Sequence, residues 1–326
     1  MKNAICVFFA TIAVFMLGMG ENAFAQQAPL FSQYMFNGLY LNPAYAGYKN
    51  ELYIQGLYRT QWVGVDGAPK FLTVSADGNV AREKVGLGLM FSNDRAGAQQ
   101  ITSFMSNYSY KIMLGDFTTL SFGLGFGAIQ YAMEGAKLKP GSMGDPRVAT
   151  ANYNTWVPEG NAGVYLYTDR FYVGLSAMNL VSKYISQESD EHFIERAETQ
   201  MFVTAGVLLP LSEDFQLKPS VLFREDFKAS SSADLNLMLL IYDRIWVGGS
   251  YRMGLKLWKD VATVGQFQSD AASLILEVFA TKKIRVGYSY DFDFKGFRGH
   301  QGGTHEVSLG VYITPRMRRM LSPRYF

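Results

Sequence analysis

The strongest constraint on the fold is a pair of alternating segments near the end of the chain, at residues 284–291 and 306–313. In the first, every second residue from Ile284 to Tyr290 is apolar or aromatic, and in the second this holds from Val307 to Ile313. A period of two puts these side chains on one face of a strand and the small or polar ones on the other. Because a lone hairpin is marginal in water, the apolar face needs a partner.

The same alternation recurs along the chain from residue 51 and predicts about fourteen strands. In the clearest case, Leu120, Phe122, Leu124 and Phe126 alternate with a serine and three glycines. The predicted strands cover residues 52–60, 71–78, 85–91, 101–110, 118–131, 162–168, 171–180, 201–209, 215–224, 235–241, 245–252, 273–279, 284–291 and 306–313.

The connections between these strands alternate in length. The short ones are 79–84, 111–117, 169–170, 212–214, 243–244 and 281–283; the long ones are 61–70, 92–100, 132–161, 181–200, 225–234, 253–272 and 292–305. Short turns at one rim and long loops at the other are typical of outer-membrane barrels. We therefore predict an all-β fold, an up-and-down antiparallel transmembrane β-barrel with short periplasmic turns and long extracellular loops. Both chain ends are then expected on the short-turn, periplasmic side.

Composition agrees with a barrel in a membrane. Charged residues are 18% of the chain and aromatic residues 15%, whereas roughly a quarter of the residues of a soluble domain are charged. A mean hydropathy of +0.01 excludes a helical membrane bundle, but it permits a barrel, whose strands are apolar on one face only. The net charge of +2 gives no reason to expect nucleic acid.

The N-terminus has the features of a signal peptide. Lys2 is followed by an apolar run at residues 4–17, and an Ala-Phe-Ala site ends at Ala25, so cleavage before Gln26 is predicted. The only cysteine, Cys6, lies in this segment, and the mature chain is therefore predicted to have no disulfide, cysteine-ligated metal or cysteine nucleophile. Export without a spanning helix leaves a soluble protein or a barrel. The predicted location is the outer membrane of a Gram-negative bacterium.

We expect four parts: a signal peptide at 1–25, an N-terminal segment at 26–50, the barrel at 51–313 and a basic tail at 314–326. Pro29 and Pro43 interrupt the second part, which is therefore not a clean strand. It is expected to pack at the mouth of the barrel or inside it. The tail is either solvated in the periplasm or in contact with lipid headgroups or a periplasmic partner.

No catalytic, cofactor or metal-binding residue is predicted. His305 and Glu306 begin like the zinc-protease motif, but position 309 is leucine and the segment is a strand. A serine at 176 lacks the strand-to-helix elbow of hydrolases. The glycines at 123–127 are spaced by two, unlike a dinucleotide fingerprint, and are expected to be small inward residues that leave room in the lumen. Charged residues are expected to line a polar interior: Arg59, Arg252, Arg285, Asp291 and Glu306.

The segment at 27–47 resembles the N-terminal signature of the PorP/SprF family, outer-membrane proteins of the type IX secretion system of Bacteroidetes. Shorter matches follow in order at 59–62, 67–69, 120–124, 217–220, 246–252, 288–291 and 303–306. The basic tail is a departure from the family pattern. The signature residues are Phe31, Ser32, Gln33, Tyr34, Asn37, Asn42, Pro43, Ala44, Tyr45, Gly47, His305 and Glu306.

The resemblance implies a non-enzymatic barrel of the secretion and gliding-motility machinery. Its partners would be periplasmic and lipoprotein components and cargo with a C-terminal sorting domain, whose export or surface attachment it would support through protein–protein contacts. Two alternatives stay open. One is an outer-membrane channel for small or hydrophobic solutes, with the N-terminal segment as a plug. The other is an outer-membrane hydrolase that uses His305.

Overall fold

The computed structural model describes residues 31–80, 83–137, 152–185, 197–227, 231–255, 271–293 and 302–313. The predicted signal peptide, with Ala25 and Gln26, and the basic tail lie outside these residues. No helix in the described ranges is long and apolar enough to cross a membrane.

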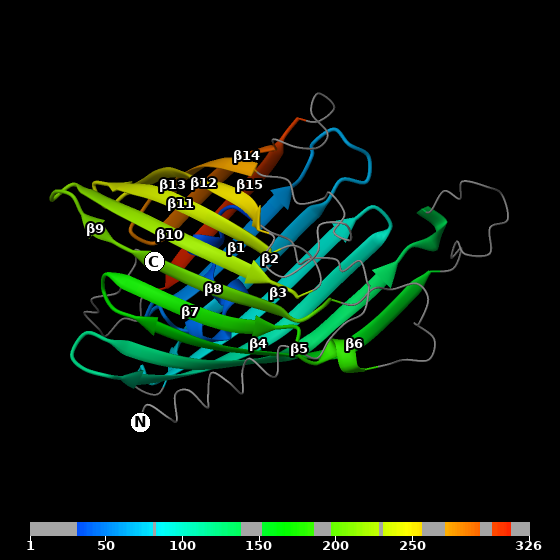
Figure 1. The fold of residues 1–326 in the computed structure, drawn as a ribbon, viewed down its shortest axis with the longest axis horizontal. Coiled ribbons are helices and arrows are strands. Elements are labelled where there is room, and N and C mark those ends of the chain that lie inside the picture. Colours follow the sequence, from blue (N-terminus) through cyan, green and yellow to red (C-terminus); the bar gives the residue numbers. More distant parts are fainter. Residues whose placement is uncertain are drawn as a thin grey trace.

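The described residues form a closed antiparallel barrel of 14 strands, which confirms the predicted fold (Figure 1). Each strand pairs with its neighbours in sequence, and β1 pairs with β15 to close the wall. The strands are β1 (Leu52–Thr60), β2 (Lys70–Val80), β3 (Val85–Ala96), β4 (Gln99–Met113), β5 (Thr119–Met133), β6 (Tyr153–Tyr167), β7 (Phe171–Met178), β8 (Gln200–Val207) with its short continuation β9 (Leu209–Pro210), β10 (Phe215–Glu225), β11 (Ser231–Ile241), β12 (Ile245–Leu255), β13 (Ala271–Phe279), β14 (Ile284–Asp293) and β15 (Thr304–Ile313).

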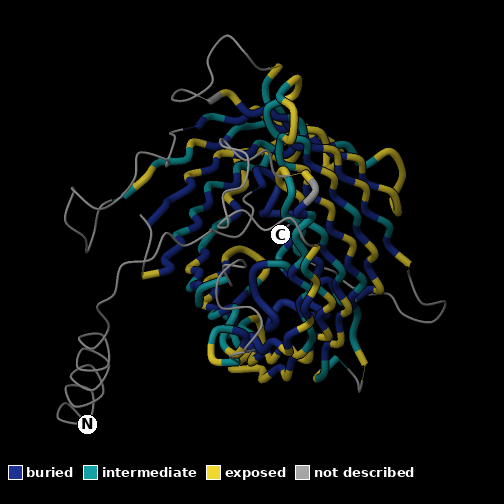
Figure 2. The backbone as a smooth tube through the Cα atoms, turned by 90° about the vertical axis from the view of Figure 1, so that its right-hand side faces the viewer, coloured by how far each residue is buried: buried dark blue, intermediate teal, exposed yellow. Residues whose placement is uncertain are grey.

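The side chains alternate across the wall as the period of two requires. In β5 the serine and glycines from Ser121 to Gly125 are buried, whereas Phe122, Leu124 and Phe126 are exposed, the last by 61%. Buried and exposed positions alternate in the same way around the barrel (Figure 2). The apolar face therefore contacts lipid, and the small, polar face lines the lumen.

Several strand boundaries differ from the prediction. β3 runs to Ala96 and β4 begins at Gln99, so the predicted long loop at 92–100 is wrong and a turn of two residues joins these strands. β6 begins at Tyr153 rather than residue 162. The prediction missed its first half, which contains Pro158, a residue uncommon inside strands, although buried Thr155, Val157 and Glu159 alternate there with exposed residues. It pairs with β5 along its full length, from Met133 opposite Tyr153 onwards. The predicted strand 201–209 is divided at Leu208, which is out of register and donates its N–H to Arg170 instead.

The wall is uneven in height. β4, β5 and β6 have 15 residues each, whereas β7 and β8 have eight. On the outer face, Phe91, Phe104 and Trp156 form a row with ring centroids 4.9 and 6.1 Å apart, as expected at a lipid–water interface. Toward the long-loop ends, the residues on the same side of the sheet include the polar Thr102, Gln130 and Asn154, and Gln130 lies opposite Trp156. The long-loop ends of β4–β6 thus extend past this aromatic row, and the β5–β6 pair extends farthest in Figure 1.

Residues 31–50 lie inside the barrel and are named here the plug. They form three short helices, η1 (Tyr34–Phe36), α2 (Gly38–Leu41) and η2 (Pro43–Tyr45). The plug runs along the lumen from the level of Arg59, near the long-loop ends, to the short-turn end, where the chain enters β1. The ends of the barrel do lie at the short-turn rim. The first described residue does not, because the plug folds back into the lumen.

Candidate functional site

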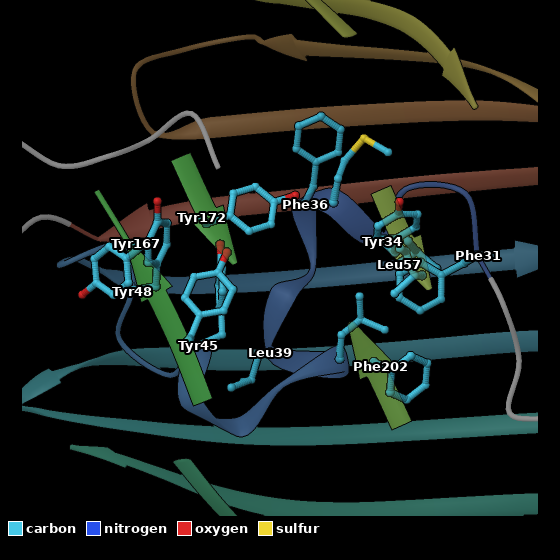
Figure 3. Close-up of a cluster of buried hydrophobic side chains, with 14 of the residues drawn as sticks. Phe31, Tyr34, Phe36, Leu39, Tyr45, Tyr48, Leu57, Tyr167, Tyr172 and Phe202 are labelled. Atoms are coloured by element: carbon cyan, nitrogen blue, oxygen red, sulfur yellow. The ribbon is translucent and has the colours of Figure 1, made fainter. Parts of the chain in front are cut away.

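The contact between the plug and the inner wall is the most densely organised part of the molecule. Aromatic rings of the plug pack against rings of the wall at both ends, and Figure 3 shows this for Tyr48 and Tyr167. Phe31 lies 5.7 Å from Phe71 of β2, and Tyr48 lies 4.6 Å from Tyr167 of β6, measured between ring centroids. Burial raises the pKa of the Tyr48 hydroxyl well above its ordinary value, so this ring is neutral. Such ring pairs contribute about 0.5–1.5 kcal/mol each beyond the area they bury.

At the long-loop end, two wall carboxylates bind the start of the plug. The backbone N–H groups of Ser32 and Gln33 donate to the two oxygens of Glu306, at 2.6 and 3.1 Å. The Ser32 hydroxyl donates to Asp291 Oδ1 at 2.6 Å and lies 2.9 Å from the Ser273 hydroxyl. One plug residue is therefore bound by β13, β14 and β15 together.

Arg59 of β1 completes this group. Its Nη1 donates to Asp291 Oδ2 at 2.6 Å and also to Glu306. Glu306 is fully buried, with 0% of its surface exposed, and a buried charge requires both a counter-charge and hydrogen bonds. Arg59 supplies the counter-charge, and the plug N–H groups supply charge-assisted hydrogen bonds. The plug and Arg59 thus stabilise the same carboxylate.

The next signature residues contact neighbouring strands. The Ser308 hydroxyl donates to Gln33 Oε1 at 2.6 Å, and Gln33 Nε2 lies 3.4 Å from Ser289 Oγ. Asn236 of β11 donates to the hydroxyl of Tyr34. Asn37 is buried between η1 and α2, where its backbone N–H donates to the Tyr34 carbonyl at 2.9 Å.

Asn42 binds the opposite wall of the barrel. Its amide Nδ2 donates to the carbonyls of Val164 on β6 and Leu175 on β7, at 3.0 and 3.2 Å. Its Oδ1 accepts the N–H of Ala44 at 2.9 Å and caps η2, where Pro43 occupies a first-turn position. An asparagine fits this position because one amide provides both the donors and the acceptor.

Small wall residues let the plug backbone approach the sheet directly. Ser121 and Ser109 donate to the carbonyls of Ala44 and Ala46, at 2.7 and 2.8 Å. A Cβ added to Gly123 would lie 2.0 Å from Ala44 N. The expectation that the glycines at 123–127 leave room in the lumen is therefore wrong at Gly123, because the plug occupies the space above it.

The short-turn end of the plug is held by charged residues. Gly47 has a φ of +67°, which favours glycine, and donates its N–H to Asp77 Oδ2 at 2.8 Å. Lys111 Nζ donates to the Gly47 carbonyl at 2.5 Å and to Asn79 Oδ1 at 2.6 Å. Lys49 lies in the plug rather than in a membrane-spanning strand, and burial lowers the pKa of its ammonium to about 7.

His305 and Glu306 point to opposite faces of β15. Glu306 enters the lumen, whereas His305 lies outside, with Nδ1 2.8 Å from the Tyr288 hydroxyl and Nε2 3.3 Å from the Gly302 carbonyl. Within the described ranges, no three His, Cys, Asp or Glu side chains are grouped to hold a metal ion. The pattern at 303–306 is structural: Gly303 has a φ of +86°, and Thr304 accepts the N–H of Trp62 at 3.3 Å.

Sequence reasoning missed the wall residues that bind the plug, among them Ser109, Ser121, Ser176, Asp77 and Asn236. Their only signal was a row of inward small or polar residues, which is common to polar lumens. What the site can do chemically is bind a peptide segment by its backbone. Wall side chains on β2, β4, β5, β7 and β15 form hydrogen bonds with the carbonyl and N–H groups of the plug.

The fold and this site define the class of protein, an outer-membrane β-barrel whose lumen contains its own N-terminal segment. The chain matches the family model described as type IX secretion system membrane protein PorP/SprF over residues 23–311. It therefore belongs to that family, and it is a membrane component of the type IX secretion system. A comparison with curated proteins gave no match.

Solved structures with a similar fold are also outer-membrane barrels. Omp33 of Acinetobacter baumannii is 9% identical, covers 82% of this chain and 100% of its own, and has a TM-score of 0.46. A FadL homologue of Pseudomonas aeruginosa is 12% identical, with coverages of 84% and 92% and a TM-score of 0.47. The monoaromatic hydrocarbon channel CymD is 12% identical, with coverages of 92% and 97% and a TM-score of 0.48.

Proposed function

We propose that this barrel supports the export or surface attachment of secreted cargo through protein–protein contacts and is not an enzyme. The observation that carries the proposal is the plug. From Phe31 to Tyr48 nearly every plug residue is buried, and both ends of the segment are bonded to the wall. A lumen filled in this way supports a role for the outer surfaces of the barrel rather than for a path through it.

The proposed extracellular contact surface is the projecting part of β4, β5 and β6. Polar side chains on this surface are bonded across strands. Asn93 of the adjacent β3 donates to Thr102 at 2.8 Å, and Gln130 donates to Asn154 at 2.8 Å. A rigid polar face above the outer leaflet is suited to a protein partner on the cell surface. Cargo with a C-terminal sorting domain is the proposed partner there.

The short turns are the proposed contacts for periplasmic and lipoprotein components of the secretion machinery. They hold exposed charged residues, including Asp214 and Asp243, and Gln216 donates to Asp243 at 3.1 Å. The two rims would thus contact different partners, and the barrel would fix the distance between them. The channel alternative has less support, because it requires the plug to leave its contacts.

Deletion of the gene tests the proposal at the level of the cell. We expect cargo to be lost from the cell surface or the medium, with uptake of small solutes unchanged. Normal cargo export combined with lost solute uptake would instead support the channel.

Single cysteines test the two rims, since Cys6 is the only native cysteine. Gln130→Cys should react with a membrane-impermeant maleimide on intact cells, and Gln216→Cys only after permeabilisation. Attaching a bulky polymer to Gln130→Cys should then reduce surface cargo. An unmodified Gln130→Cys strain is the matched control. Full cargo attachment despite complete modification would exclude this face as the contact.

A further inference from the structure

The first half of β6 has a neighbouring strand on one edge only. Residues 153–161 pair with β5 along their full length, whereas β7 pairs with β6 only from Ala162 to Tyr167 (Figure 1). Beyond this point the chain of β7 turns away at Asn179, whose φ is +58°. Among the residues that the structure describes, no strand pairs with the second edge of residues 153–159.

Glu159 holds the departing chain on the inner side of the wall. The Glu159 side chain is buried, and its carboxylate accepts the N–H groups of Val181 and Ser182, at 2.8 and 3.3 Å. The N–H of Leu180 donates to the Gly160 carbonyl at 3.0 Å. These contacts end the pairing at Gly160 and draw the described part of the loop inward, so they leave the edge beyond Gly160 open.

The open edge presents the backbone groups of Asn154 and Trp156. In an antiparallel sheet the backbone groups of successive residues point to alternate edges, and the Gly160 carbonyl marks the edge that faces away from β5. By this alternation Asn154, Trp156 and Pro158 face the open edge. Within the described ranges, the edge-facing N–H and C=O groups of Asn154 and Trp156 have no backbone partner. Each of these two residues can therefore exchange a pair of hydrogen bonds with a further strand.

Pro158 confines the free donors of this edge to the region outside the lipid. Trp156 belongs to the aromatic row at the lipid–water interface, and Pro158 lies two residues nearer the short-turn end. Lipid cannot satisfy a backbone N–H group, and proline has none. The free donors thus end where lipid begins, and those that remain can pair with another chain.

The side chains along the open edge do little to prevent such pairing. Natural edge strands are commonly protected by charged residues, lysine in particular, whereas residues 153–158 carry no charge. The Trp156 side chain is 46% exposed on the outer face, where an aromatic ring favours an apolar or aromatic residue directly opposite on a paired strand. An edge of this kind fits an extended chain that adds one strand to the sheet.

Symmetry excludes a second copy of this barrel as the source of that strand. Two β6 edges in an antiparallel pair are related by a two-fold axis perpendicular to the sheet. Such an axis lies in the membrane plane and would invert one of the two barrels. A parallel pair requires the axis to follow the strands, which are tilted by about 35–45°. Copies in one membrane are related by axes along its normal, so neither pairing can form.

We propose that the open edge of β6 binds an extended strand of the surface cargo through the backbone groups of Asn154 and Trp156. The bound strand continues the sheet beyond β6 and places an apolar residue opposite Trp156 on the outer face. This inference rests on the proposed function, in which cargo contacts the projecting part of β4–β6, and it assigns the hydrogen-bonding groups of that contact.

Hydrogen exchange of the purified mature barrel in detergent, resolved residue by residue, tests whether the edge is open. The amides of Thr155 and Val157 face β5 and should exchange slowly. The amides of Asn154 and Trp156 should exchange at nearly the rate of an unstructured peptide, because no strand protects them. Slow exchange at Asn154 and Trp156 in the barrel alone would show that another part of the chain covers the edge, and it would overturn the proposal.

Proline substitution tests the pairing in cells. Asn154→Pro combined with Trp156→Pro removes both edge donors, and proline is tolerated where the strand N–H faces away from the neighbouring strand. The readout is the set of proteins that deletion of the gene removes from the cell surface, labelled on intact cells with a membrane-impermeant biotin. Their surface level should fall about tenfold or more in the proline variant, as the loss of about 1.4 kcal/mol of hydrogen bonding implies.

The matched comparison is Asn154→Ala combined with Trp156→Phe, which changes the same side chains but keeps both N–H groups. It should lower the surface level much less than the two prolines do. Heat-modifiable migration on gels identifies the variants that form the barrel. If the double proline variant fails to fold, Asn154→Pro alone, at the second residue of β6, should lower the surface level severalfold.

Two results would overturn the pairing and leave the proposed function standing. One is a wild-type surface level in a folded proline variant, and the other is an equal loss in the variant that keeps both N–H groups. A gene deletion that removes no protein from the surface would overturn the proposed function and this inference together.

Discussion

A methyl group at Gly123 should loosen the plug. Gly123→Ala places a Cβ 2.0 Å from the backbone nitrogen of Ala44 and 2.4 Å from its Cα. Both are main-chain atoms, so no side-chain rotation relieves the overlap and the plug has to shift. Overpacking of this kind typically costs about 1–3 kcal/mol. That cost raises the undocked fraction of the plug about 5- to 150-fold.

The undocked fraction is measurable by thiol labelling. Ala46 is fully buried in the plug, and Ala46→Cys introduces a thiol two residues beyond the overlap. When docking is fast relative to labelling, the rate of reaction with a small maleimide reports the undocked population. Gly123→Ala in this background should raise that rate about 5- to 150-fold.

Gly125→Ala is the matched control on the same strand and the same face. Its Cβ would lie 2.8 Å from Asn107 Oδ1 and 3.2 Å from Asn161 Cβ. The nearest of these atoms is the end of a side chain that can move, so the labelling rate should change much less. Equal labelling rates with and without Gly123→Ala in the Ala46→Cys background would refute the assignment of Gly123 as a close contact of the plug.

Three further variants test other parts of the site by urea unfolding in detergent. Glu306→Gln removes the charge that both Arg59 and the plug stabilise, and it should lower the free energy of unfolding by about 1–3 kcal/mol. The double variant Glu306→Gln/Arg59→Gln should lose less than the sum of the two single variants. Additive losses would contradict the coupling between these two residues. Asn42→Ala loses two wall hydrogen bonds and a cap and should cost a similar amount, whereas an unchanged midpoint would contradict those contacts. The His305 side chain lies outside the lumen, so His305→Ala should change the free energy of unfolding by less than about 0.5 kcal/mol and leave cargo export intact. Loss of a lipase activity in this variant would instead support the hydrolase alternative.

The plug is the element about which the sequence alone predicted the least structure. Its composition excluded a clean strand, but its direction along the lumen and its contacts could not be inferred. The reason is that its partners are remote: Ser32 binds Asp291 and Glu306, which are 259 and 274 residues away. Nothing in the local pattern around Ser32 indicates which strands will face it.

The sequence by itself determined the barrel. One face of each strand meets lipid, so the alternation of side chains and the lengths of the connections follow from local chemistry and can be read along the chain. Tertiary structure alone decided the contents of the lumen. Closure brings β1 beside β15 and puts Arg59 opposite Glu306, and only this closure determines which buried carboxylates, serines and glycines meet the plug.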